Sequence, residues 1–139
     1  MAAPPPTAWA TVIDVHRVAG WVSVVGAVEE REHLARYGAV LSDRLGPFRV
    51  AADLDVRVTD LDEGRSISFS ADGEDRQVAS RIKIEARLSL ADGNSGTQVD
   101  VAGSYEVTGR VASLGSSMIR AKGDKILDEF FFALERELA

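Results

Sequence analysis

The C-terminal stretch, residues 109–139, most constrains how this chain can fold, because it carries a helical apolar face. At about 100° per residue, apolar and small side chains gather on one side of a helix drawn through it. They are Ile119, Gly123, Ile126, Leu127, Phe130, Leu134 and Leu138. Charged residues occupy the opposite side. The pattern predicts one long helix whose apolar face covers the core formed by the rest of the chain.

The two halves of this predicted helix differ in side-chain size. Residues 111–123 are mostly alanine, serine and glycine, whereas residues 126–138 carry leucine, isoleucine and phenylalanine. Because protein interiors are packed to nearly crystalline density, small side chains above a sheet leave either a close approach or a void. We expect the second half to close the core and the first half to leave an apolar cavity, unless neighbouring loops fill that space.

Residues 26–108 alternate between apolar and polar side chains with the two-residue period of strands. The runs cover residues 26–30, 36–45, 48–59, 67–71, 78–90 and 99–107. Turn residues separate the later runs, at 46–47, 60–64, 72–75 and 92–96. Hairpin-linked strands with one apolar face predict an antiparallel sheet of about six or seven strands, and therefore an α+β fold. Two short helices, over residues 7–14 and 15–20, precede the sheet.

Composition limits the class of protein. A chain of 139 residues predicts one domain over residues 1–139. The net charge of −6, spread without long runs, disfavours nucleic acid or an anionic membrane as an electrostatic partner. The absence of cysteine excludes disulfides and thiolate metal sites. Without a long apolar run or a signal-like start, we expect a cytoplasmic protein.

Residues for covalent or metal chemistry are few. The two histidines, His16 and His33, have no acidic partners at zinc-site spacing and lie in no nucleophile motif. Gly93 and Gly96 belong to a hairpin turn and do not form a phosphate-binding loop. The sequence therefore predicts no metal, no cofactor and no catalytic residue.

The predicted cavity has a definite set of lining residues, because inward strand positions can be matched to the small half of the helix. The ligand-binding candidates are Leu41, Val50, Ala52, Phe69, Ile84, Tyr105, Leu114 and Met118. The hydroxyls of Tyr37 and Tyr105 could bond a ligand carbonyl, or both rings could serve packing alone. Asp43 is in phase with the inward residues. It either enters the cavity, as a base or a ligand contact, or lies close enough to the following turn to reach water.

Phe132 is a candidate docking residue. It falls among charges on the side of the helix that also carries Leu114 and Met118. The three residues predict a patch for a partner protein or a membrane surface, although a single exposed phenylalanine is also ordinary.

Several segments, in this order, resemble the CoxG family, which is the G-subunit family of carbon monoxide dehydrogenase, within the START-like, or SRPBCC, superfamily. The stretch Pro4-Pro5-Pro6-Thr7-Ala8-Trp9 is similar to the superfamily's opening motif. The family resemblance rests on Gly46-Pro47-Phe48, Val58-Thr59-Asp60-Leu61-Asp62, and Leu114-Gly115-Ser116 followed by Phe130-Phe131. It covers nearly the whole chain.

The resemblance implies a helix-grip fold, in which a curved antiparallel sheet holds the C-terminal helix around a hydrophobic ligand pocket. It also implies an accessory of a molybdenum-containing carbon monoxide dehydrogenase or related hydroxylase, which handles a quinone-like or lipid ligand or contacts the inner face of the membrane. Two departures stand out. The family's usual first strand is reduced to residues 1–3, and Ser23-Val24 replaces a Pro-Gly turn.

Together, the residues and the resemblance predict a non-catalytic binder or carrier of a hydrophobic small molecule. Two alternatives remain. The first is a polyketide cyclase or aromatase-like enzyme of the same superfamily, in which Asp43 and Tyr105 supply acid–base chemistry. The second is a pure docking module that uses Leu114, Met118 and Phe132.

Overall fold

The computed structural model describes residues 1–45, 47–75, 77, 79–93 and 96–139. Its elements, in chain order, are α1 (Pro5–Val12), α2 (Val15–Ala19), β1 (Val25–Glu32), β2 (Arg36–Leu45), β3 (Phe48–Asp62), β4 (Ser66–Asp75), β5 (Ser80–Gly93), β6 (Gly96–Gly109), η1 (Arg110–Leu114) and α3 (Ser116–Leu138). The predicted positions Gly46, Val78, Asn94 and Ser95 lie outside the described residues.

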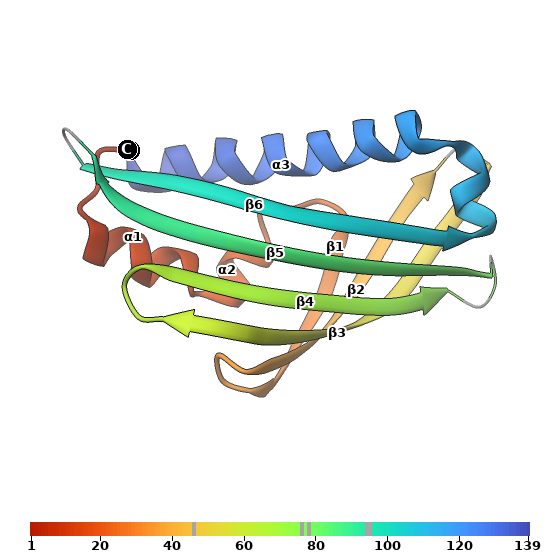
Figure 1. Ribbon diagram of the computed structural model, residues 1–139, viewed down its shortest axis with the longest axis horizontal. Helices are drawn as coiled ribbons and strands as arrows, with labels where there is room; N and C mark the ends of the chain where they lie inside the picture. The colour runs from red at the N-terminus through yellow and green to blue at the C-terminus, as the bar shows by residue number, and fades with distance from the viewer. Residues whose placement is uncertain (46, 76, 78, 94–95) are drawn as a thin grey trace.

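The strands form a six-stranded antiparallel sheet in the order β1-β2-β3-β4-β5-β6, with each strand paired to its neighbour in the chain. The sheet is curved, and α3 runs along it beside β6, with the two short helices near the C-terminal end of α3 (Figure 1). This confirms the predicted α+β architecture, in which one long helix covers an antiparallel sheet.

One predicted turn is shorter than expected, and another is wrong. Of the predicted turn 60–64, residues 60–62 belong to β3, and the chain turns at residues 63–65. The predicted turn 72–75 is wrong, because β4 continues through it. Gly73 permits a close approach between strands here, since a Cβ on it would clash with the Asp53 carbonyl oxygen. The Asp75 carboxylate accepts a hydrogen bond from the Ala51 backbone N–H at 2.6 Å. Glycine and aspartate thus serve strand pairing here, where their usual turn preference suggested a break.

The predicted single C-terminal helix is two helices, because Gly115 interrupts it. The 3₁₀ helix η1 ends at Leu114, and Gly115 takes φ 92° and ψ 156° before the 23 residues of α3 begin. This backbone conformation is open almost only to glycine. The run of small residues from 111 to 117 therefore contains a change of direction that helical periodicity did not reveal.

Among the residues that the structure describes, most of the buried apolar side chains form two clusters, one toward each end of α3. The first joins α1, β5 and the C-terminal part of α3 through Ala8, Trp9, Val12, Leu90, Leu134 and Leu138. The second joins β3, β5 and η1 through Val50, Ala52, Leu54, Ile82 and Val111. Bulky side chains thus pack against the inner face of the sheet toward both of its ends.

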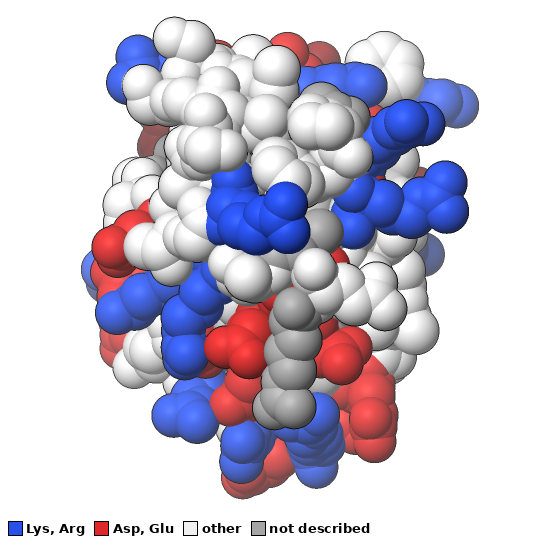
Figure 2. Space-filling model, turned by 90° about the vertical axis from the view of Figure 1, so that its right-hand side faces the viewer, with Lys and Arg blue, Asp and Glu red and all other residues white. Residues whose placement is uncertain are grey.

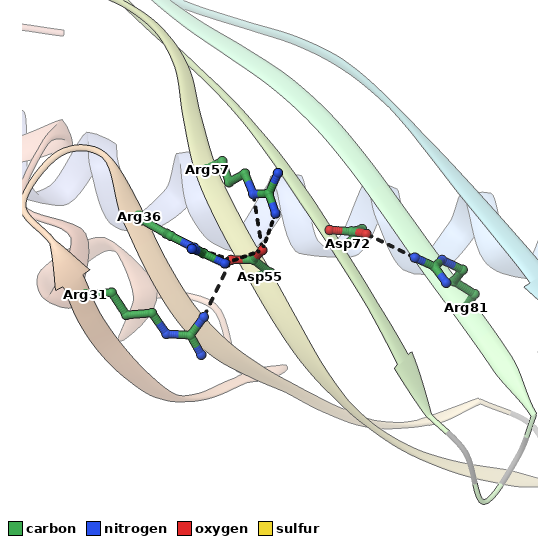
Figure 3. Close-up of polar contacts among 6 residues, drawn as sticks. All are labelled: Arg31, Arg36, Asp55, Arg57, Asp72 and Arg81. Carbon is green, nitrogen blue, oxygen red and sulfur yellow. Dashed lines mark hydrogen bonds and ion pairs between the residues drawn. The ribbon is translucent and has the colours of Figure 1, made fainter.

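The outer face of the sheet carries a group of ion pairs centred on Asp55 (Figure 3). Arg36 Nε lies 3.0 Å from Asp55 Oδ1, and Arg57 Nη2 lies 2.9 Å from Oδ2. Arg31 Nη1 approaches the same carboxylate at 3.6 Å. Hydrogen bonding from Arg36 is the largest cause that lowers the pKa of Asp55 from 3.8 to about 2. This network ties β1, β2 and β3 together on the solvent side.

Replacing Gly115 by alanine should lower the free energy of unfolding by about 1–3 kcal/mol, because alanine is strained in this backbone conformation. A Cβ at Gly115 would meet no atom within 4 Å, so the cost is conformational. The control is Gly20→Ala, at an ordinary φ of −66°. Urea unfolding of both variants checks the prediction, and equal stabilities would contradict it.

Replacing Asp55 by asparagine should flatten the acid limb of the stability profile between about pH 4 and pH 2. With its pKa lowered to about 2, the folded carboxylate releases its proton more readily than the unfolded one. Its contribution is therefore complete above the unfolded pKa and lost as the pH falls through the folded pKa. Thermal unfolding against pH measures this. The exposed Asp60→Asn variant should keep the wild-type slope, and an unchanged slope in Asp55→Asn would refute the assignment.

Candidate functional site

A cavity of about 290 Å³ lies beneath the first half of α3, between the two core clusters. Its walls come from β2, β5, β6, η1 and α3 and are largely aliphatic. Lining residues from the helix include Ile119, Gly123, Ile126 and Leu127. Bulky side chains therefore begin to close the core only at Phe130, one turn later than the change of side-chain size predicted.

One wall of the cavity carries an ion pair between α3 and β2. Lys122 Nζ lies 2.7 Å from Asp43 Oδ2, and the side chains are 27% and 21% exposed. Oδ2 is shielded from solvent, and the contact is an ion pair without hydrogen-bond alignment. The other oxygen, Oδ1, accepts a hydrogen bond from the Arg44 backbone N–H at 2.8 Å. Asp43 thus faces the cavity, one of the two alternatives left open by the sequence.

The same flank of α3 is held to the segment before β1. Glu129 accepts hydrogen bonds from the Ser23 backbone N–H at 3.0 Å and from its hydroxyl at 2.8 Å. These bonds, the backbone one foremost, lower the pKa of Glu129. The ring of Trp21 lies 6.0 Å from that of Phe130. Ser23 therefore holds α3 along this side.

The opposite flank of α3 lies against β6 along a line that we call the β6–α3 seam. It is formed by Gly103, Ser104 and Tyr105 of β6 and by Asp124 and Leu127 of α3, all of which line the cavity. Tyr105 and Leu127 are 45% and 43% exposed. A Cβ at Gly123 would lie 3.3 Å from the Tyr105 ring, so the ring rests directly against the helix. The seam is the side on which the cavity approaches solvent.

The predicted ligand-binding residues divide into two groups. Leu41, Ile84 and Tyr105 line the cavity. The others do not: Val50 and Ala52 belong to the second core cluster, Leu114 packs against it, Met118 is 45% exposed, and Phe69 sits on β4 opposite Ala86. Inward orientation alone did not distinguish a cavity wall from a packed core, because both lie on the same face of the curved sheet.

Several lining residues lie outside the predicted set, and two of them on α3 are charged, Lys122 and Asp124. Lys122 stands three residues after Ile119 and four before Ile126, a spacing that places it beside them on the helix. Tyr37 has a structural role, since its hydroxyl accepts a hydrogen bond from the Leu34 backbone N–H at 2.8 Å. Both histidines are exposed.

The predicted docking residues do not form one patch. Phe132 is 65% exposed, with the Arg136 guanidinium 5.8 Å from its ring centre. Met118 is about 21 Å away along the helix axis at 1.5 Å per residue. Leu114 belongs to η1 and is partly buried.

Two further features bear on the kind of site. Over the residues that the structure describes, no three His, Asp or Glu side chains gather as metal ligands. No helix in those ranges is long and apolar enough to cross a bilayer.

Solved structures match this architecture over nearly its whole length. A conserved protein from Geobacillus kaustophilus is 20% identical, covers 99% of this chain and 90% of its own, and superposes with a TM-score of 0.86. TTHA0849 from Thermus thermophilus is 17% identical, with 99% and 91% coverage and a TM-score of 0.71. CV1439 from Chromobacterium violaceum is 14% identical, with 97% and 92% coverage and a TM-score of 0.60. Among proteins with curated descriptions, none matches the sequence significantly.

A curved antiparallel sheet that holds a long C-terminal helix above an apolar cavity defines a protein of the helix-grip class. The family model for the carbon monoxide dehydrogenase G subunit (CoxG) matches residues 1–139. The chain therefore belongs to the CoxG family, as its motifs predicted.

Proposed function

We propose that this protein is a non-catalytic binder or carrier of a hydrophobic small molecule, held in the cavity beneath α3. The observation that carries the proposal is the aliphatic cavity between two well-packed core clusters. Binding pockets for small molecules are typically concave and apolar, with a few polar groups that fix orientation. The cavity has this character, with Lys122 and Asp43 on one wall.

Family membership suggests the setting in which the molecule is carried. The family is named for a subunit of carbon monoxide dehydrogenase, which supports an accessory role beside an enzyme of that kind. We propose a molybdenum-containing hydroxylase as the partner and a quinone-like or lipid molecule as the ligand. The protein would work as a single domain in the cytoplasm, with peripheral contact at the inner face of the membrane.

A cyclase-like enzyme is less well supported by the cavity. Asp43 is engaged by the Lys122 ammonium group and the Arg44 backbone N–H, so its carboxylate is already neutralised and bonded. The other residue of that alternative, Tyr105, lines the cavity but has its ring against α3 at Gly123. General base catalysis needs a group that is free to accept a proton from the substrate.

One end of the molecule suits a peripheral membrane contact. Residues 109–123 include Arg110, Arg120 and Lys122 and no acidic residue. Arg44 and Arg49 face each other on the adjoining β2–β3 hairpin, and the Arg110 guanidinium lies 5.8 Å from the Phe48 ring centre. Figure 2 shows basic side chains around a largely uncharged area in the upper part of this end, and acidic side chains below it. The upper part of this end thus carries basic side chains although the net charge of the chain is negative, and of the basic residues in 109–123, Lys122 is paired with Asp43.

Filling the cavity should remove the co-purifying ligand. Ala86 lines the cavity, so Ala86→Phe should reduce the bound apolar molecule at least about tenfold, as measured by native mass spectrometry and solvent extraction. Ala102→Phe adds the same ring at an exposed position on β6 and is the control. Equal occupancy in both variants, or wild-type protein that is empty and not stabilised by added quinones or lipids, would overturn the proposal.

Reversing charge at the basic end should weaken binding to anionic vesicles. We expect Arg49→Glu with Arg110→Glu to lower the affinity for phosphatidylserine-containing vesicles at least about tenfold, since each basic group near a membrane contributes about 1 kcal/mol. The control pair, Arg65→Glu with Arg136→Glu, makes the same change in net charge away from this end. Co-sedimentation measures both, and equal losses would argue against a contact at this end.

A further inference from the structure

The largely aliphatic wall of the cavity includes three charged residues. Among the described residues that line it, these are Lys122, Asp43 and Asp124, with formal charges of +1, −1 and −1. Lys122 and Asp43 form the ion pair on the β2 wall, and Asp124 lies on the β6–α3 seam. The charged residues of the lining therefore sum to −1.

A lysine and an aspartate that together line an aliphatic cavity are costly to keep there. Removing both ions from water costs more than a close contact fully recovers, and an apolar pair of similar size is often as stable. The pair joins α3 to β2, and aliphatic side chains line the same cavity, including Val24, Leu41 and Ile119. A role in recognising a ligand accounts for this arrangement.

Lys122 offers the ligand hydrogen-bond donors. An ammonium group has three N–H donors and no acceptor, and the Asp43 carboxylate lies 2.7 Å away on one side of it. An oxygen atom of a molecule in the cavity can accept a hydrogen bond from it. Because Asp43 already neutralises the Lys122 charge, the pair offers an anionic head group no net attraction, and such a group would lie within a few ångströms of the Asp43 carboxylate.

The structure assigns Lys122, held by Asp43, as the polar anchor of the cavity, and its ligand as an amphiphile whose neutral, oxygen-accepting head group bonds to the Lys122 ammonium. This inference rests on the proposed function and specifies the chemistry of its ligand. A ketone, quinone or ester oxygen meets the requirement, whereas a fatty carboxylate does not.

The size of the cavity determines how much of such a ligand fits inside it. At about 290 Å³ it is at the small end of the range for ligand pockets. It holds a ring-sized head group, and a long apolar tail must leave it. Tyr105 and Leu127, each more than two-fifths exposed, supply an apolar exit at the β6–α3 seam, on the flank of α3 opposite Lys122.

Three probes with the same naphthalene ring separate the contributions of the apolar ring, a neutral oxygen and a carboxylate to the binding affinity. Naphthalene has no acceptor, 1-acetonaphthalene has a neutral carbonyl oxygen, and 1-naphthoate has a carboxylate. We expect wild-type protein to bind 1-acetonaphthalene at least about tenfold more tightly than either of the others, a difference in keeping with one hydrogen bond to a charged group. Equilibrium titration and ligand-induced thermal shifts measure the three affinities.

Substitutions then test the anchor itself. Lys122→Met should lose the preference for 1-acetonaphthalene over naphthalene, and Lys122→Arg should keep it. Asp43→Asn should tighten the binding of 1-naphthoate, because it removes the repelling charge. Lys125→Met, at an exposed position of the same helix, is the control and should match the wild type. The naphthalene affinity of each variant reports whether its cavity is intact.

The outcomes distinguish the two proposals. If none of the three probes binds wild-type protein, the cavity is not a binding site and both proposals fail. If all three bind equally, or if Lys122→Met loses naphthalene and 1-acetonaphthalene to the same extent, the cavity binds ligands but Lys122 is not the anchor. Tighter binding of 1-naphthoate than of 1-acetonaphthalene overturns the neutral head group.

Discussion

Attachment of α3 at separate points is the constraint on which this molecule depends. Its C-terminal part is fixed by Leu134 and Leu138 against α1 and β5, and its start follows η1, whose Val111 is buried in the second cluster. A helix of about 35 Å that is fixed near both ends cannot also contact the concave face of a curved sheet along its whole length. The space beneath its middle is therefore kept open by the rest of the fold, and no lining residue has to hold it open.

The two flanks of α3 explain how such a cavity can be both stable and accessible. On the side of β1 and β2, the helix is held by the Asp43–Lys122 ion pair and the bonds from Ser23 to Glu129. On the side of β6, Gly103 and Gly123 bring no side chain, and the Tyr105 ring lies against the helix at Gly123. The flank of α3 toward β1 and β2 is thus held by polar contacts, and the flank toward β6 gives access to the cavity.

Sequence patterns predicted the architecture better than the site, for physical reasons. Two-residue alternation fixes which strand residues face inward, so the sheet and its cover followed from it. It does not report curvature, which decides that Leu41 borders empty space while Val50 lies in a packed cluster. Polarity was also misleading at Lys122, whose position faces inward although its type suggests solvent. Gly115 was hidden for a similar reason, because small residues fit a helix and a break equally well.

The cavity also affects how the stability of the protein responds to hydrostatic pressure. Unfolding eliminates internal voids, so it is accompanied by a decrease in volume, and hydrostatic pressure favours the unfolded chain. Any volume that neither water nor a ligand fills is concentrated in the cavity of about 290 Å³ between the two core clusters. An occupant that fills the void would stiffen the molecule there. Occupancy and resistance to pressure are thereby linked, even for a ligand that leaves the backbone unmoved.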